Sequence, residues 1–275
     1  MTLSKKFNVW LVIGILTIIF SYGLTNAQIK IMPLGDSITK GTGSSDNGGY
    51  RDDLQSYLTD YGVSYDFVGS QSDGSGFLTN HEGHEGFTSG DILSNVNGWL
   101  TTFSPNFVIL MIGANDVTEI ANGTITVADA VSNIDGIVNA IHSNNASTHI
   151  LISSLTPRTD AQDSLTTALS HRIKYVYENK KATGYKIHYV GTGELFRTNE
   201  TWADDYMDDF LHPNDSGYNV IAMGLFHRMI NIIQEANSGL NRILIDNFDR
   251  QTTDLLDVWA HDGTYGIQVV SGKRE

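Results

Sequence analysis

The sequence lacks cysteine and is poor in proline. Of its 275 residues none is Cys and 4 are Pro, whereas 27 are Gly. Without thiols the chain has no disulfides, no thiolate metal site, no thiol nucleophile and no lipid-modified N-terminal cysteine. We therefore expect its stability to come from packing alone, in one sizeable core of the kind that a chain of this length can bury.

Basic residues are also few. Lys and Arg number 17 against 31 Asp and Glu, so the net charge is −14. A chain this acidic repels nucleic acid and anionic membrane surfaces, and we expect neither as a partner. No feature of the sequence specifies an oligomeric state.

An apolar stretch near the N-terminus is typical of an exported protein. Lys5 and Lys6 precede the apolar Val9–Phe20, and the small residues Thr25-Asn26-Ala27 then offer a cleavage point. The apolar core is shorter than the roughly 20 residues that span a bilayer, although an uncleaved membrane anchor is the alternative. We expect residues 1–27 to be a signal peptide and the mature protein to be secreted, with no stable membrane association after cleavage. Removing the two lysines takes the net charge from −14 to −16.

Short apolar runs alternate with longer segments of helical periodicity. This alternation predicts a parallel sheet with helices on both faces and right-handed crossovers. The expected strands are Ile29–Leu34, Tyr65–Val68, Phe107–Ile112, His149–Leu155 and Lys186–Val190. The expected helices are Tyr50–Tyr61, Asp91–Leu100 (capped by Asp91 or Ser89), Thr126–His142, Asp163–Lys181 and Tyr218–Glu235. The polar segments 70–90 and 191–217 are expected to be loops.

The alternation stops near Ser238. Arg242–Asp249 and Thr264–Ser271 resemble strands, and nothing helical separates them. We expect residues 28–237 to form one domain, and 238–275 to be a β-rich appendage or the truncated start of a second module. A segment this short does not fold alone without help.

A serine directly follows the first expected strand. The block Gly35-Asp36-Ser37-Ile38-Thr39 puts the Ser37 hydroxyl at the carboxyl end of that strand. In α/β folds this edge of the sheet is where reacting groups gather. The alternative is that Asp36 and Ser37 merely cap a turn or a helix, as these residue types often do.

Three further blocks supply the groups that a nucleophilic serine needs. A serine hydroxyl is a poor nucleophile unless a base takes its proton, and His212 is the candidate base. Asp209 can hold the tautomer of that imidazole and stabilise the imidazolium that forms. The blocks are His84-Glu85-Gly86-Phe87-Thr88 after the second strand, Gly113-Ala114-Asn115-Asp116 at the end of the third, and Asp209-Phe210-Leu211-His212-Pro213 before the last helix.

Other polar residues near these blocks are expected to be structural. Asp36 and Asp116 are predicted to hold their turns by side-chain-to-backbone hydrogen bonds. Arg51 is predicted to form a structural ion pair, the alternative being that it lines the site. The stretch His81-Glu82-Gly83-His84-Glu85 invites a metal interpretation, but a glycine interrupts it and its spacing is not that of the helical zinc-protease motif. We expect no metal here, and a loop that shapes the rim of the substrate site.

With its four blocks in this order, the sequence resembles the SGNH, or GDSL, hydrolase superfamily from Ile29 to about Ala236. The resemblance implies a flavodoxin-like three-layer α/β/α sandwich with a five-stranded parallel sheet, and it makes residues 28–237 the catalytic domain. It implies a serine esterase that needs no cofactor. The catalytic residues would be Ser37, Asp209 and His212.

The resemblance also implies an oxyanion hole. Its donors would be the backbone N–H groups of Ser37 and Gly86 and the side-chain amide of Asn115. A glycine suits a loop amide that must face the reacting carbonyl, because no Cβ obstructs the approach. A side-chain amide donor of this kind contributes about 10²–10³ in rate.

Two loops make the likeness finer. Gly48-Gly49-Tyr50-Arg51 and His81–Phe87 resemble the acetylxylan esterases of carbohydrate esterase family 3. The sequence is thus interpreted as a secreted esterase that removes acetyl groups from plant cell-wall polysaccharide, with acetylated xylan as the expected substrate. The alternatives are an SGNH lipase or arylesterase, a deacetylase of pectin or another glycan, and a carbohydrate-binding relative that kept the fold and lost turnover.

Overall fold

Five apolar runs form parallel strands of one sheet, as the sequence predicts. The computed structural model describes residues 28–237, 257–261 and 264–268. Every residue of the central strand β5 is buried, as expected for a strand covered on both faces. The five strands are β1 (Ile29–Gly35), β2 (Tyr65–Phe67), β5 (Phe107–Met111), β6 (His149–Ser153) and β7 (Ile187–Val190).

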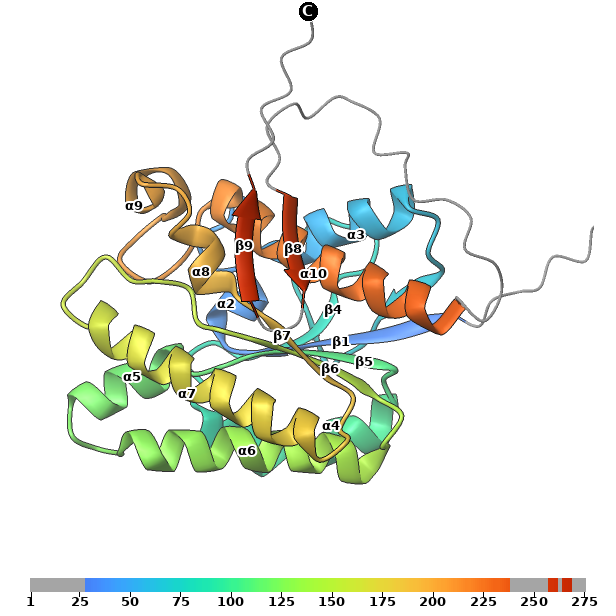
Figure 1. Cartoon of the computed structure of the whole chain (residues 1–275), viewed down its shortest axis with the longest axis horizontal. Coiled ribbons are helices and arrows are strands. Elements are labelled where there is room, and N and C mark those ends of the chain that lie inside the picture. The colour runs from blue at the N-terminus through green and yellow to red at the C-terminus, as the bar shows by residue number, and fades with distance from the viewer. Residues whose placement is uncertain (1–27, 238–256, 262–263, 269–275) are drawn as a thin grey trace, which may run out of the picture. The chain divides into compact units, whose positions relative to one another are not determined.

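The order of these strands places a switch point at β1. β2 pairs with one edge of β1 and β5 with the other. β6 and β7 follow beyond β5 (Figure 1). The chain therefore goes outward from β1 to β2 and then returns to the opposite side of β1. In open parallel sheets, ligands bind outside the carboxyl ends of the strands at such a point.

The segment 70–90 is not the uninterrupted loop that its composition predicts. It contains β3 (Gln71–Ser72) and β4 (Asn80–Gly83), which pair antiparallel, and β4 runs parallel to the end of β1. These two strands bring the sheet to seven. The prediction fails because Asn-His-Glu-Gly carries no strand pattern of its own, and pairing with β1 imposes the extended conformation on it.

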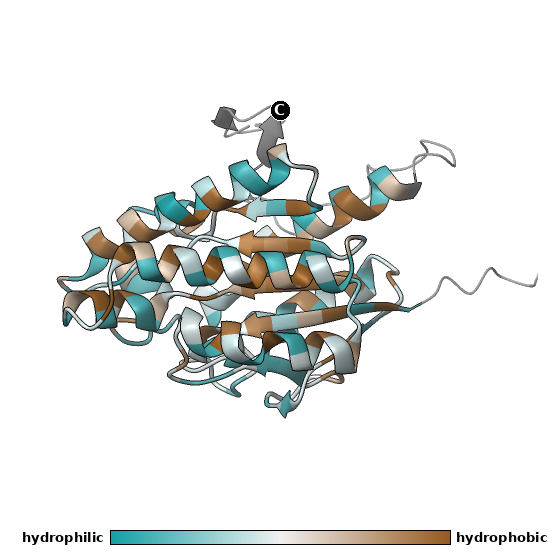
Figure 2. Cartoon of the chain, turned by 90° about the horizontal axis from the view of Figure 1, so that it is seen from below, coloured by the Kyte–Doolittle hydropathy of each residue, from teal (hydrophilic) through white to brown (hydrophobic). Residues whose placement is uncertain are grey.

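Helices cover both faces of the sheet and give the predicted three layers. In Figure 1, α3 (Tyr50–Asp60) and the first part of α10 (Asp215–Asn237) lie on one side of the strands, and α4 (Ser89–Phe103), α6 (Val127–Asn144) and α7 (Asp163–Ala182) lie on the other. Side chains alternate along a strand, so each central strand contributes to both layers. Figure 2 shows the hydrophobic strands enclosed by helices whose outer faces are largely hydrophilic. The core on the α4, α6 and α7 side includes Met32, Leu34, Val108, Leu110, Ile150, Ile152, Ile92, Val96, Ile134, Ile137, Leu169 and Ile173.

Helix α4 begins with a capping box at Thr88, so the predicted caps Asp91 and Ser89 are wrong. The Thr88 hydroxyl accepts from the backbone N–H of Asp91, and the Asp91 carboxylate accepts from the backbone N–H of Thr88 at 2.9 Å. Asp91 thus occupies the third helical position, where an acidic side chain completes such a box. Helix α6 begins in the same way, with Thr126 and Asp129.

Four short helices were not predicted, because such short segments show no clear periodicity. Two of them begin directly after strands, namely α2 (Ser37–Lys40) after β1 and α5 (Ala114–Ala121) after β5. The other two, α8 (Thr192–Phe196) and α9 (Trp202–Tyr206), lie in the segment 191–217 that was expected to be a loop.

The chain divides into two compact units, Met1–Ile232 and Ile233–Glu275. In the second unit, β8 (Asp257–His261) and β9 (Thr264–Gln268) form an antiparallel pair, and β9 lies within the predicted strand Thr264–Ser271. The predicted signal peptide and the predicted strand Arg242–Asp249 lie outside the described residues. Among the helices of the described ranges, none is long and apolar enough to cross a bilayer.

Candidate active site

Three adjacent strands end together where the predicted site residues lie. Gly35 at the end of β1 is paired with Gly83 of β4 on one side and with Met111 of β5 on the other. Ser37, Gly86 and Asn115 each follow shortly after one of these strand ends. The sheet register therefore gathers three of the predicted residues at one edge.

The serine begins a helix that packs tightly on the strand ends. Ser37 is the first residue of α2, and Asp36 is its N-cap, with its carboxylate accepting from the Ile38 backbone N–H at 3.0 Å. A Cβ at Gly35 would lie 1.9 Å from the Met111 carbonyl oxygen, so only glycine fits there. Within the described part of the chain, the Ser37 backbone N–H donates to no acceptor.

Asp36 has a structural role, as predicted, and its carboxyl group is buried. It is 1% exposed, and burial raises its pKa to about 6 although hydrogen bonds from the Ile38 and Ala114 backbone N–H groups favour the charged form. The bond to Ala114 ties the end of β1 to the start of α5. Asp36 therefore holds the frame around Ser37.

Ser37, His212 and Asp209 form one chain of hydrogen bonds. The Ser37 Oγ lies 3.0 Å from Nε2 of His212, and Nδ1 of the same ring lies 2.8 Å from Oδ2 of Asp209. An ionised carboxylate can only accept, so Nδ1 carries the ring proton and Nε2 accepts from the serine hydroxyl. This is the arrangement in which a neutral imidazole can take a proton from a serine.

A tight turn holds Asp209 beside the imidazole. Its Oδ1 accepts the backbone N–H groups of Leu211 and His212, both at 2.6 Å. Burial alone would raise the pKa of Asp209, but hydrogen bonds from the His212 ring and from these two N–H groups outweigh it and lower the pKa. Asp209 is therefore ionised at neutral pH.

The candidate oxyanion donors Gly86 and Asn115 both adjoin Phe87, Gly86 along the chain and Asn115 through a hydrogen bond. Gly86 has a φ of +78°, which favours glycine, and its N–H donates to no acceptor in the ranges that the structure describes. The Asn115 Nδ2 donates to the Phe87 carbonyl oxygen at 2.9 Å. An amide carries two N–H groups, so this bond fixes the side chain and leaves one donor over. The sequence did not predict that the Phe87 carbonyl oxygen orients Asn115, because every residue has a backbone carbonyl and none is marked by its side chain.

Asp116 is also structural, but it acts across elements rather than within its own turn. It is 0% exposed and accepts from the Ser89 backbone N–H at 2.8 Å and from the Ser89 hydroxyl at 2.5 Å. Burial raises the pKa of Asp116, although these hydrogen bonds favour the charged form. The bonds tie α5, which carries Asn115, to the start of α4.

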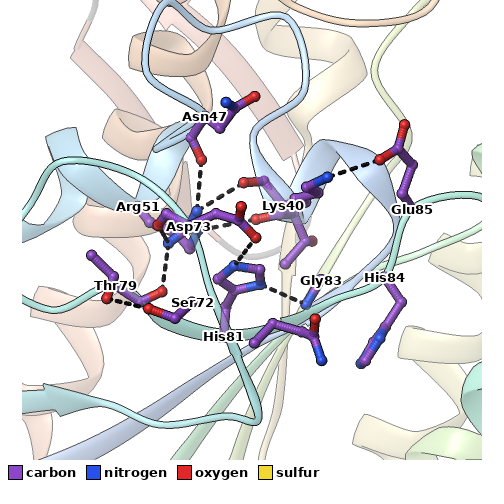
Figure 3. A network of polar contacts seen from close by, with 12 residues as sticks. Lys40, Asn47, Arg51, Ser72, Asp73, Thr79, His81, Gly83, His84 and Glu85 are labelled. Atoms are coloured by element: carbon purple, nitrogen blue, oxygen red, sulfur yellow. Dashed lines mark hydrogen bonds and ion pairs between the residues drawn. The ribbon is translucent and has the colours of Figure 1, made fainter.

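Arg51 forms no ion pair among the described residues, so that prediction is wrong. Its guanidinium is completely buried and donates five hydrogen bonds, all to backbone carbonyls (Figure 3). An arginine has five N–H groups, so each has an acceptor. The carbonyls belong to Thr39 and Lys40 in α2, Asn47 in the following turn, and Asp73 and Thr79 around the β3–β4 connection. Arg51 therefore links the helix of Ser37 to the strand that leads to Gly86.

The two histidines of the 81–85 stretch make internal contacts, and Figure 3 shows those of His81. Burial lowers the pKa of His81 to about 3, so its ring is neutral, and its Nδ1 accepts from the Gly83 backbone N–H at 2.9 Å. His84 Nε2 lies 2.8 Å from the buried Glu82 carboxylate, and the His84 ring stacks on Phe87 and Trp99. In the described residues, no group of three or more His, Asp or Glu is arranged to hold a metal ion.

Comparison with known proteins identifies relatives of this arrangement. The model of the GDSL-like Lipase/Acylhydrolase family matches residues 34–220. A family 3 carbohydrate esterase from Clostridium thermocellum is 30% identical, with a TM-score of 0.67 over 76% of this chain and 98% of that one. A family 3 carbohydrate esterase from Talaromyces cellulolyticus is 25% identical, with a TM-score of 0.64 over 76% of this chain and 99% of that one.

A sequence relative covers part of the chain. A multidomain esterase from Ruminococcus flavefaciens is 37% identical over an alignment of 115 residues, and the match covers 33% of this chain and 15% of that protein. The chain therefore spans only a small part of the length of this curated relative.

Proposed function

The chain belongs to the GDSL-like lipase/acylhydrolase family and is a carboxylic ester hydrolase. From that premise we propose that it is a secreted serine esterase. Its proposed reaction is the deacetylation of plant cell-wall polysaccharide, acetylated xylan in particular. The observation that carries the proposal is the hydrogen-bonded chain Ser37–His212–Asp209. The backbone N–H groups of Ser37 and Gly86, which bind no acceptor among the described residues, follow the ends of β1 and β4. The two family 3 carbohydrate esterases among its structural relatives support an acetylated carbohydrate as the substrate.

In the acylation step Ser37 is the nucleophile. Its Oγ attacks the carbonyl carbon of the acetyl ester while Nε2 of His212 takes the hydroxyl proton. Asp209 keeps the ring in the tautomer that leaves Nε2 free, and its negative charge stabilises the imidazolium. When the tetrahedral intermediate collapses, His212 returns the proton to the departing sugar oxygen, and an acetyl group remains on Ser37.

The negative charge of the tetrahedral intermediate develops on the former carbonyl oxygen, which accepts hydrogen bonds from three N–H donors. These are the backbone N–H groups of Ser37 and Gly86 and the second amide N–H of Asn115. Because the packing of α2, β4 and α5 holds them in place beforehand, little reorganisation is needed when the charge forms. In deacylation, His212 deprotonates a water that attacks the acetyl carbon, and the same donors stabilise the second intermediate. When that intermediate collapses, the bond from the acetyl carbon to the Ser37 Oγ breaks, His212 returns the proton to Oγ, and acetate leaves.

The surroundings of the site favour a short acyl group. The segments 70–90 and 192–215 contribute only Phe77 and Phe210 to the exposed large hydrophobic side chains of the described residues. A long acyl chain needs a continuous apolar channel, because each buried methylene contributes only about 0.8 kcal/mol and only where wall atoms exist. These polar segments instead suit a sugar that lies across the rim.

Two measurements on the purified full chain test the proposal, with Ser37→Ala as the inactive control. Acetate release from acetylated xylan, acetylated pectin and other acetylated glycans should be fastest on xylan. The kcat/KM on p-nitrophenyl esters should fall steeply from acetate to butyrate and be negligible at octanoate. Faster turnover of octanoate than of acetate would instead identify a lipase, and preference for another glycan would change the substrate but keep the chemistry.

A further inference from the structure

The segment from Asp209 to His212, here called the catalytic loop, carries an aromatic residue between its two candidate catalytic residues. Phe210 follows Asp209 and precedes His212 by two positions, and it is 52% exposed. Single exposed hydrophobic residues are common on protein surfaces and need no explanation by themselves. The position of Phe210 and the way it is held distinguish it from Tyr175, which is 57% exposed on α7.

The backbone of Phe210 is fixed from both sides. Its carbonyl oxygen accepts from the Thr159 backbone N–H at 3.1 Å, which joins the catalytic loop to the segment after β6. On the other side, the Leu211 N–H is bound to the Asp209 carboxylate. The ring therefore projects from a rigid turn, and little conformational freedom would be lost when a ligand packs on it.

The ring rests on a buried guanidinium. The Cζ of Arg158 lies 5.5 Å from the Phe210 ring centroid, and Arg158 is 3% exposed. Arg158 in turn is held by two hydrogen bonds to the Asp160 carboxylate, at 2.7 and 3.0 Å, and by one of 3.4 Å to the Ala114 carbonyl oxygen. Ala114 directly precedes Asn115, so this support reaches back to the oxyanion donors. One ring face lies toward Arg158, and the exposure of the residue leaves the opposite face to solvent.

We propose that Phe210 is a sugar-binding platform of this esterase, on which a pyranose ring of the acetylated polysaccharide stacks while its ester enters the site. A pyranose has an apolar face of C–H groups, and an aromatic ring offers a flat apolar surface of matching size. The inference rests on the proposed function, because it needs a carbohydrate as the substrate. Phe210 contacts the sugar and takes no part in the proton transfers.

The test compares two acetyl esters on Phe210→Ala, Phe210→Tyr and Tyr175→Ala. Acetylated xylo-oligosaccharide provides a pyranose, whereas triacetin has no ring of any kind, so it cannot stack. For Phe210→Ala, the ratio of kcat/KM on the oligosaccharide to kcat/KM on triacetin should fall about tenfold, mainly through KM, as expected for the loss of roughly 50–60 Å² of buried apolar surface. Phe210→Tyr should restore the ratio. Tyr175→Ala, which removes an equally exposed ring from the outer side of α7, should leave both rates unchanged.

The possible failures are distinguishable. If Phe210→Ala lost activity equally on both esters, the residue would act by positioning Asp209 and His212, and the platform would be wrong. An unchanged ratio in an active Phe210→Ala variant would also contradict it. If the wild-type chain hydrolysed triacetin but deacetylated no polysaccharide, the proposed function would be wrong and the platform with it.

Discussion

Asn115 has two amide protons, and the fold uses one of them. The bond to the Phe87 carbonyl oxygen sets the orientation of the amide, so the second proton is available in a fixed direction. An interaction that strengthens only when the oxyanion forms should affect kcat and leave KM largely unchanged.

We therefore expect Asn115→Ala to lower kcat on p-nitrophenyl acetate by about 10²–10³ with little change in KM. Asn97→Ala, which removes an exposed asparagine from α4, is the matched control and should behave as wild type. Ser37→Ala and His212→Ala should each abolish most turnover in folded protein, and Asp209→Asn should cost less than the loss of His212. A loss of less than about threefold in Asn115→Ala would mean that the amide is not an oxyanion donor.

Asp36 gives the folded protein a pH dependence of its own. Its pKa is about 6 in the folded state against an ordinary value of 3.8, because the carboxyl is buried. The folded state therefore binds the proton more tightly than the unfolded chain does. The stability that this group contributes is complete below about pH 4 and is lost as the pH rises through 6.

Asp36→Asn should remove this dependence, since Asn keeps a side-chain oxygen for the Ile38 N–H and has no charge to bury. The free energy of unfolding of the variant minus that of wild type should increase by about 2 kcal/mol between pH 4 and pH 7. Urea denaturation of both proteins at several pH values in that interval measures the difference. A difference that stays constant with pH would contradict the raised pKa.

At the scale of elements, apolar periodicity predicted the helices and strands that carry a pattern in their own sequence. It did not predict the strands that form only by pairing with another strand. Five strands and five long helices could be predicted because each of these segments has its own pattern of apolar residues. β4 could not, because Asn80–Gly83 becomes a strand only through its pairing with β1. The predicted ion pair of Arg51 was wrong for a related reason. Its five acceptors are backbone carbonyl oxygens, and the sequence does not show which backbone groups lie near a side chain. The candidate site was predictable from motif order, whereas the Phe87 carbonyl that holds Asn115 was not.

The two capping boxes allow a prediction that separates stability from catalysis. Thr88 begins α4 next to Phe87, and Thr126 begins α6 with the same box in a segment that contributes no candidate site residue. We expect Thr88→Ala and Thr126→Ala each to lower the free energy of unfolding by about 1 kcal/mol, because each leaves a helix N-terminus uncapped.

Only Thr88→Ala should also lower kcat, since fraying at the start of α4 loosens the Phe87 carbonyl that orients Asn115. Chemical denaturation gives the first quantity, and kcat on p-nitrophenyl acetate gives the second. Equal kcat values in the two variants would show that the start of α4 has no influence on the oxyanion donors.

At the scale of the whole molecule, no disulfide adds to the stability that packing provides. A buried group that becomes charged therefore lowers the free energy of unfolding without compensation from a covalent cross-link. The described residues include neutral imidazoles at two places in the sheet. His81 is buried on β4. His149 and His188 are partly buried and lie 3.1 Å apart, Nδ1 to Nε2, on the neighbouring strands β6 and β7. Burial lowers the pKa of His81 to about 3 and those of His149 and His188 to about 4.

An unfolded histidine titrates near 6.5, so the unfolded chain binds these protons first as the pH falls. Their contribution to stability is complete above about pH 6.5 and is lost progressively toward pH 4, with an upper value of roughly 3–5 kcal/mol for each group. The carboxyls whose pKa burial raises change the stability in the opposite direction over the same interval, Asp36 by about 2 kcal/mol. Asp52, Asp53 and Asp116 act in the same sense. We expect the three histidines to outweigh these carboxyls, so that the free energy of unfolding falls as the pH is lowered from 7 to 4.5. His188→Gln, which cannot take up a proton, should make this fall shallower when urea denaturation is measured across the interval. A protein that became more stable toward pH 4.5, or a His188→Gln variant with the wild-type slope, would show that these imidazoles do not govern its behaviour in acid.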